Sequence, residues 1–285
     1  MLAVHQYKVV RPFNNNVLLV ERMSDGHEMV LIGKGLGFAE KKGNILISND
    51  TRIEKTFLLE DEASRKQYQT MLNQVEDATI GVSEEIISLI AKHLSPVYNQ
   101  HIHIALPDHI AFAIHRLKNG MEIVNPFLYE IETLYPQEYA LSKLAAQLIE
   151  TRLNVNIPAS EVGFLALHIH SSVSQTPISQ AVRHADLIRD ILQMVRNGMN
   201  VQLAQGSRDC IRFVTHLKYA LERLHSGKTI ENPLLERIRH EFPHEFDFAE
   251  KIAGRIEQSL DIKVPAGEIG YITMHVHRLL NTQTK

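Results

Sequence analysis

Two histidine pairs recur along the chain, each at the end of the same ten-residue pattern. The first copy reads EVGFLALHIH and ends in His168 and His170, and the second reads EIGYITMHVH and ends in His275 and His277. Imidazole is largely neutral near pH 7, and it can act as a nucleophile, a proton carrier or a metal ligand. The recurrence therefore indicates a chemistry that the chain keeps twice.

A metal site is one chemistry that such spacing suggests. Residues two apart on a helix point about 200° away from each other, so His168 and His170 cannot hold one ion if their segment is helical. The sequence also has neither an HExxH motif nor Cys-rich metal spacing. We expect neither a metal nor a cofactor. For His170 and His277, a buried histidine that satisfies its own hydrogen bonds stays open as the alternative.

The histidines belong to a longer duplication. Adding 107 to each residue number from His109 to His170 gives the segment 216–277 without a gap, and about a third of the positions are identical. The alignment begins on another repeated histidine, His109 in one copy and His216 in the other. A unit of this length is far longer than the roughly 20–50 residues of a solenoid repeat. We conclude that a whole domain is duplicated.

His109 follows Asp108, whereas His216 follows Thr215. A histidine in apolar helical surroundings beside a carboxylate suits a phosphoryl acceptor, because the carboxylate can fix its tautomer. Phosphorylation would add close to two negative charges, enough to make or break an interface. The residue pattern allows this role without selecting it.

The segments that position these histidines divide the chain into β and α parts. Residues 1–57 carry short β-branched runs separated by turn formers such as Ser24-Asp25-Gly26, which predicts a small antiparallel β domain. From Glu60 onward, apolar residues recur at helical spacing. Prolines precede five of the helical runs, as is favoured at helix starts; they are Pro107, Pro126, Pro158, Pro233 and Pro265.

The predicted fold is multidomain. A small antiparallel β domain at 1–57 precedes two duplicated all-α helical-bundle domains at 65–173 and 180–285, and the polar segment 171–180 is expected to be a linker or a domain boundary. A β domain of that size buries little core by itself, so we expect it to form a homodimer.

Composition narrows the class of protein. The chain has 285 residues, is 44% hydrophobic and has a net charge of −3, so as a whole it is not a nucleic-acid-binding polycation. Its single cysteine allows no internal disulfide. The first residues lack the apolar run of a signal peptide, and no stretch is long and apolar enough to span a membrane. We expect a cytoplasmic protein without membrane insertion.

The β domain carries residues suited to nucleic acid. GKGLGF is not a dinucleotide fingerprint, because Phe38 stands where that motif needs glycine. Asn14 and Asn16 can bond base edges, Phe38 can stack on a base, and Arg11 and Lys34 can meet phosphates, which is how unpaired RNA is recognised. Asparagines that only serve turn geometry are the alternative interpretation.

Motifs in both parts of the chain resemble one family. NNNV, LIGKGLGF and RIEKTFLL resemble the RNA-binding module of the BglG/SacY transcriptional antiterminators, and the duplicated helical unit resembles the phosphotransferase-system (PTS) regulation domain that follows it twice. QHIHIALPDHIAFAIHR and NPFLYEIETLYPQEYAL are most similar to the glucose-type members. The resemblance covers nearly the whole chain.

The resemblance implies a mechanism. A dimer of the β module would bind a hairpin in the leader of a nascent messenger RNA and so prevent formation of an overlapping terminator. The regulation domains would accept phosphate on histidine from the phosphocarrier protein HPr and from a sugar-specific PTS permease, here the glucose enzyme II. The protein would accept phosphate without turning over a substrate, so it would not be an enzyme.

The resemblance also implies which residues act. The phosphorylation sites would be His109, His168, His216 and His275, supported by Asp108, His170 and His277. The RNA contacts would be Arg11, Asn14, Asn16, Gly33, Lys34 and Phe38.

Two other functions fit parts of the pattern. A PTS-regulated DNA-binding activator would need a helix-turn-helix, and the N-terminal region is predicted to be strands instead. A histidine-rich metallohydrolase would need carboxylates and histidines that converge within each helical unit.

Overall fold

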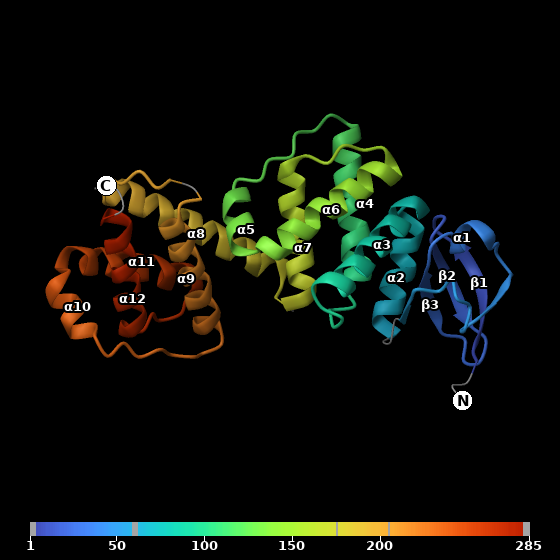
Figure 1. Ribbon diagram of the computed structural model, residues 1–285, viewed down its shortest axis with the longest axis horizontal. Helices are drawn as coiled ribbons and strands as arrows, with labels where there is room; N and C mark the ends of the chain where they lie inside the picture. The colour runs from blue at the N-terminus through green and yellow to red at the C-terminus, as the bar shows by residue number, and fades with distance from the viewer. Residues whose placement is uncertain (1–3, 59–61, 175, 205, 282–285) are drawn as a thin grey trace. The chain divides into compact units, whose positions relative to one another are not determined.

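The computed structural model of the chain describes residues 4–58, 62–174, 176–204 and 206–281 (Figure 1). The predicted change from strands to helices at Glu60 lies outside these residues. The order of elements confirms the predicted fold class, with an antiparallel sheet first and helices after it.

The N-terminal part forms a five-stranded sheet in the order β4-β1-β2-β3-β5, and every neighbouring pair is antiparallel. The predicted hairpin at Ser24-Asp25-Gly26 joins β2 to β3, and Gly26 adopts the positive φ of 73° that glycine tolerates best. The elements of this part are β1 (Gln6–Pro12), β2 (Val17–Arg22), β3 (Glu28–Ile32), the short α1 (Leu36–Ala39), β4 (Ile45–Ile47) and β5 (Lys55–Leu58).

The two faces of the sheet are buried by different parts of the chain. Because strand side chains alternate, Leu18 and Leu31 pack on one face with other residues of the β domain. Val17, Leu19 and Val30 pack on the opposite face, where they meet helices α2 (Glu62–Gln74) and α3 (Asp77–His93) (Figure 1). The helical part therefore completes the core that the β domain lacks, within a single chain.

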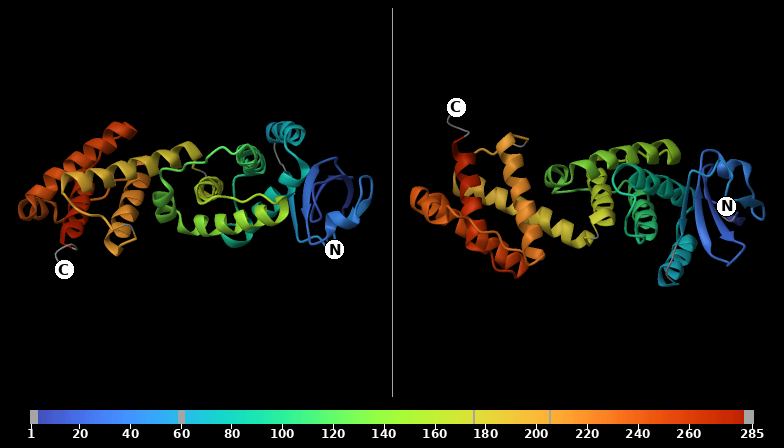
Figure 2. Two further views of the ribbon diagram at one scale, coloured as in Figure 1. Left: turned by 90° about the horizontal axis from the view of Figure 1, so that it is seen from above. Right: turned by 60° about the horizontal axis from the view of Figure 1, so that its bottom comes forward.

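The duplication reappears in the bounds of the helices. Adding 107 to the first and last residues of α5, α6 and α7 gives those of α10, α11 and α12, and α4 matches α9 to within one residue. The first copy holds α4 (Ile102–Lys118), α5 (Leu128–Leu134), α6 (Pro136–Leu153) and α7 (Ala159–Ser174). The second holds α8 (Ile178–Gly198), α9 (Arg208–His225), α10 (Leu235–Glu241), α11 (Pro243–Leu260) and α12 (Ala266–Asn281) (Figure 2).

Four of the five prolines predicted to precede a helix do so, and the prediction is wrong for Pro107. Pro107 lies inside α4, which begins at Ile102. The buried side chains of Ile102, His103 and Leu106 extend the packed face of this helix toward its N-terminus, and that packing compensates for the N–H that proline lacks. The confirmed four are Pro126, Pro158, Pro233 and Pro265, which stand one or two residues before α5, α7, α10 and α12.

The segment 171–180 contains a boundary between compact units, at Ile178/Ser179, as one of its two interpretations predicted, but it is not a linker over its whole length. Helix α7 continues to Ser174, and α8 begins at Ile178. Ser172 is buried in α7, and its hydroxyl donates a hydrogen bond to the Ile169 carbonyl. Serine hydroxyls that bond to a preceding turn are tolerated within helices, so a polar run need not end one.

The described chain forms two compact units. One comprises Met1–Asn125 with Gln137–Ile178, and the other comprises Pro126–Pro136 with Ser179–Lys285. Helix α5 thus packs within the second unit, where Lys218 donates a hydrogen bond to the Leu134 carbonyl over 2.9 Å. Among the described residues, no helix combines the length and apolar character needed to cross a membrane.

Candidate functional site

Two segments of the β domain meet at one end of the sheet. The Gly33 N–H donates to the Asn16 carbonyl over 2.9 Å, and the Gly35 N–H donates to the Asn16 side-chain oxygen over 3.0 Å. The N–H groups of Gly37 and Phe38 both donate to the Asn15 carbonyl. The asparagine turn therefore holds the glycine-rich loop, so turn geometry is one role of these asparagines.

The loop leaves an aromatic and a cation facing solvent. Phe38 is 80% exposed, and Lys34 is exposed. An exposed phenylalanine beside a lysine offers a stacking surface and a positive charge, which are the two features that recognise unpaired nucleotides. Arg11 and Asn14 lie against helix α3 instead, through contacts to Asp77 and Glu85.

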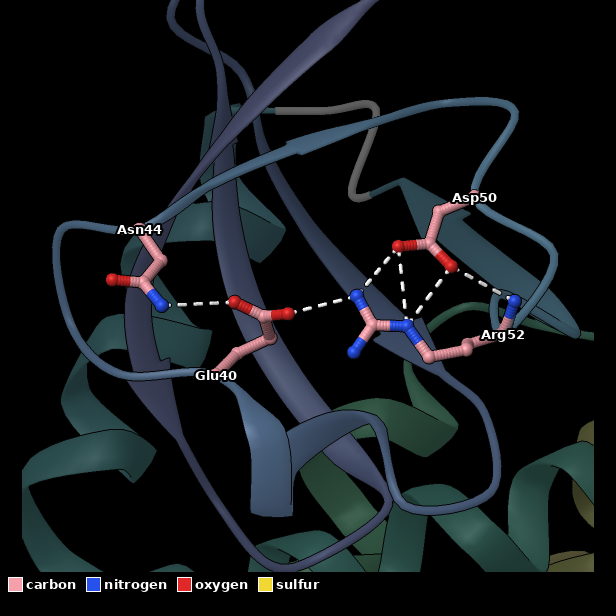
Figure 3. Close-up of polar contacts among 4 residues, drawn as sticks. All are labelled: Glu40, Asn44, Asp50 and Arg52. Carbon is pink, nitrogen blue, oxygen red and sulfur yellow. Dashed lines mark hydrogen bonds and ion pairs between the residues drawn. The ribbon is translucent and has the colours of Figure 1, made fainter.

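Gly33 is required by packing as well as by its position in the loop. A Cβ at Gly33 would lie 1.8 Å from the Arg52 carbonyl oxygen. Arg52 is fixed by hydrogen bonds to Asp50 and Glu40, and Glu40 also accepts from Asn44 over 2.9 Å (Figure 3). Hydrogen bonds from Arg52 lower the pKa of the Asp50 carboxyl. This network keeps the backbone of Arg52 pressed against the loop.

The first helical unit brings two predicted phosphorylation sites together. The rings of His109 on α4 and His168 on α7 stack with centroids 4.1 Å apart. The His109 Nε2 lies 2.6 Å from an oxygen of Glu161, and Arg116 lies 3.3 Å from the other oxygen of that carboxylate. His170 points elsewhere and pairs with Glu138 over 3.0 Å.

The second copy repeats this arrangement. The rings of His216 and His275 lie 4.6 Å apart, and the His216 Nε2 is 3.9 Å from Glu268. Arg223 donates two hydrogen bonds to Glu268, over 2.7 and 2.9 Å. His277 pairs with Glu245 over 2.9 Å, as His170 pairs with Glu138 in the first copy. The outer histidine of each pair thus has a satisfied structural role.

Sequence reasoning missed the carboxylate and the arginine of each site. It considered Asp108 as the neighbour of His109, whereas Glu161 is the carboxylate in contact with the ring. A signal was present, because Glu161 and Arg116 are identical to Glu268 and Arg223 under the 107-residue shift. Both glutamates are 1% exposed, so each arginine balances a buried negative charge.

A pocket of about 570 Å³ opens beside the rings of the first copy. His109, His168 and Asp108 line one side of it, and Thr70 and Gln74 of α2 line another. The two histidine rings of this copy therefore border an open pocket. Within the described residues, no group of three His, Cys, Asp or Glu side chains is arranged to hold a metal ion.

Burial keeps three of the four histidines neutral. Desolvation, with a contribution from His109, lowers the pKa of His168 to about 3. Desolvation also lowers the pKa of His216 to about 4, helped by Arg223, and that of His275 to about 4, helped by His216. A neutral imidazole has the free lone pair that attack on phosphorus requires.

These lowered pKa values predict a loss of stability in mild acid. An unfolded histidine binds a proton near its ordinary pKa of about 6.5, whereas folded His168 does so only near pH 3. The unfolded state therefore binds more protons as the pH falls from about 6.5, and unfolding becomes easier toward pH 4. His168→Gln should flatten this dependence, as measured by urea unfolding at a series of pH values. The exposed His93→Gln is the control, and equal pH slopes for the His168 variant and the wild type would contradict the assignment.

Comparison with known protein families divides the chain in the same order. Residues 7–66 match the family described as CAT RNA binding domain, and residues 84–172 and 189–279 match the family described as PRD domain. The two PRD matches contain the two histidine sites, and the CAT match contains the loop from Gly33 to Phe38.

Individual relatives cover nearly the whole chain. It is 32% identical over 276 residues to the transcription antiterminator LicT of Bacillus subtilis (strain 168), covering 96% of this chain and 99% of the relative. It is 33% identical over 277 residues to the PtsGHI operon antiterminator of the same organism, covering 96% and 98%. A solved structure titled as GlcT CAT-PRDI is 40% identical with a TM-score of 0.50, covering 59% of this chain and 99% of that chain.

Proposed function

Because the chain belongs to the family of transcription antiterminators that join a CAT RNA-binding domain to PRD domains, we propose that it binds a hairpin in the leader of a nascent messenger RNA. Bound protein would stabilise that hairpin against an overlapping terminator, so transcription continues. The observation that carries this proposal is the loop at the end of the sheet, where exposed Phe38 and Lys34 stand beside the Asn16 turn.

The chemistry of the loop suits unpaired RNA. Phe38 stacks on a splayed base and Lys34 meets a phosphate, while Gly33, whose missing Cβ makes room for the Arg52 carbonyl, holds the loop in place. Phosphate contacts make such binding fall with salt. Two copies of the β domain in a homodimer would present two such loops to the hairpin.

In this proposal, phosphorylation of the histidine sites controls RNA binding. His109, His168, His216 and His275 accept phosphoryl groups from HPr and from a sugar-specific PTS permease. Glu161 and Glu268 stabilise the positive charge that develops on an attacking imidazole, in the way that a carboxylate supports a catalytic histidine. The chain acts as a regulator and not as an enzyme, because phosphate is accepted and returned without turnover of a substrate.

Glucose is the sugar that the relatives support best. Relatives are named the PtsGHI operon antiterminator, the GlcA/glcB genes antiterminator and Protein GlcT. The working division is a β domain at 1–57 and regulation domains at 65–173 and 180–285, which the family matches support. Action on a nascent messenger requires the protein to be in the cytoplasm.

RNA binding by the full chain tests this function. The probe is a labelled RNA hairpin whose stem carries an unpaired internal loop, compared with double-stranded DNA of the same length at two salt concentrations. We expect salt-sensitive binding to the RNA alone. Binding to the DNA instead would favour a DNA-binding activator, and absence of binding to either at low salt would refute the proposal.

A further inference from the structure

Two of the candidate RNA contacts are occupied by acidic residues of helix α3. The Arg11 Nε lies 2.7 Å from an oxygen of Asp77, and the Asn14 side-chain N–H donates to Glu85 over 2.8 Å. The Asn14 side-chain oxygen accepts from the Asn16 N–H over 2.8 Å, so both ends of this amide are engaged. The Arg11 side chain also donates to the Leu72 carbonyl over 3.2 Å, so both side chains are held by the helical part although Arg11 stays 39% exposed.

Helix α3 packs closely against the asparagine turn at Gly81. A Cβ at Gly81 of α3 would lie 2.4 Å from the Asn14 side-chain nitrogen. Glycine at this position is what allows the helix to reach Asn14 and to place Glu85, one turn later, against its amide. A hollow of about 190 Å³ beside the loop is lined by Lys34 and by Glu85 itself.

Glu85 is also tied to the helix that follows. Arg152 of α6 lies 3.0 Å from one oxygen of Glu85 and 3.4 Å from the other, while Asn14 uses the second oxygen. Helix α6 also carries Glu138, the partner of His170 on the helix that bears His168. One carboxylate therefore joins the asparagine turn to α6, and α6 in turn contacts the helix that carries His168.

Taking the RNA-binding function as given, we propose that Glu85 and Asp77 are positioning residues that hold Asn14 and Arg11 in a closed arrangement, which must open before the hairpin binds. A carboxylate competes with a phosphate for the same donors, since both are anions that accept hydrogen bonds from arginine and amide groups. The same charges repel the RNA backbone at short range. Each closed contact thus lowers the apparent affinity, because only the open fraction binds.

The test compares hairpin binding by full-length variants. Asp77→Asn and Glu85→Gln keep size and shape while removing charge, and Glu76→Gln, an exposed acid beside the start of α3, is the matched control. We expect the double variant to bind the labelled RNA hairpin about tenfold more tightly than the wild type, each single variant to give a smaller gain, and the control to give none.

Salt dependence separates release of Arg11 from general loosening. In the wild type, Arg11 exchanges the Asp77 carboxylate for a phosphate when RNA binds, whereas in the double variant it forms the phosphate contact without losing an ion pair. The slope of log K against log salt should therefore be steeper by about one in the double variant than in the wild type. A variant that merely loosens the domain would leave this slope unchanged. Circular dichroism melts establish that each variant is folded.

The possible results are distinct. Equal affinity of the wild type and the folded double variant, or weaker binding by the variant, would overturn the closed arrangement and leave the RNA-binding function standing. If the wild type and all variants are folded but none binds the hairpin, even the double variant at low salt, the proposed RNA-binding function itself would be refuted.

Discussion

Replacing Lys34 and Phe38 together by alanine should lower the affinity of the full chain for the RNA hairpin by about 100-fold or more. Loss of base stacking on an aromatic costs about 1–3 kcal/mol per base, which is about tenfold to more than a hundredfold for Phe38 alone. Loss of Lys34 removes a phosphate contact, weakens binding further and reduces the salt slope by about one.

The fold should tolerate both changes. Phe38 is 80% exposed and Lys34 is exposed, so neither side chain contributes to the core that Leu18 and Leu31 build beneath the loop. Surface substitutions away from such cores change stability by about 0.5 kcal/mol or less. A fall in affinity can therefore be assigned to lost contacts and not to unfolding.

The matched control lies in the second helical unit. Tyr219 is 51% exposed and Lys228 is exposed, so alanine at both removes an exposed aromatic and an exposed cation far along the sequence from the loop. Fluorescence anisotropy against the labelled hairpin should leave this control at wild-type affinity. If the Lys34 and Phe38 double variant also kept it, the loop would not be the RNA contact.

The helical half illustrates what sequence patterns can predict. The 107-residue shift predicted a duplicated domain, and under that shift the bounds of α5, α6 and α7 repeat in α10, α11 and α12. Helical spacing also predicted that His168 and His170 face different partners, which they do. The spacing of apolar residues is a local property of the sequence, so it predicts helices without knowledge of how they pack.

Sequence patterns could not predict the contacts between segments that lie far apart in the chain. Glu161 meets His109 across 52 positions of sequence, a pairing that depends on how α4 and α7 pack. Pro107 lies inside its helix because buried neighbouring side chains stabilise the turn before it. A proline in the sequence does not reveal whether such packing is present. The β domain was expected to need a partner for its core, and α2 and α3 supply that cover within the chain. Homodimerisation remains a prediction.

Removing Arg223 should produce the largest loss of stability among the charged residues discussed. Glu268 is 1% exposed, and Arg223 donates to both of its oxygens. Arg223→Met keeps the aliphatic bulk but leaves a buried carboxylate without its cation, and breaking a buried pair in this way costs about 3–5 kcal/mol. Urea unfolding of the full chain, followed by circular dichroism, measures the effect in the transition of the second unit.

The duplication supplies an internal comparison for this prediction. Arg116 occupies the matching position, but it makes a single contact of 3.3 Å to Glu161, which His109 also approaches at 2.6 Å. Arg116→Met should therefore cost less, about 1–2 kcal/mol, because the buried carboxylate keeps a second partner. Equal losses at the two arginines would contradict this difference between the sites.

A second substitution distinguishes a buried charge from lost packing. If the cost of Arg223→Met comes from an unpaired carboxylate, Glu268→Gln in the same chain should recover much of the stability, because a neutral amide is far cheaper to bury than an anion. If the cost comes from lost packing of the arginine stem, the second change should recover nothing. Recovery would show that Arg223 serves to keep the buried negative charge of Glu268 beside the His216 imidazole.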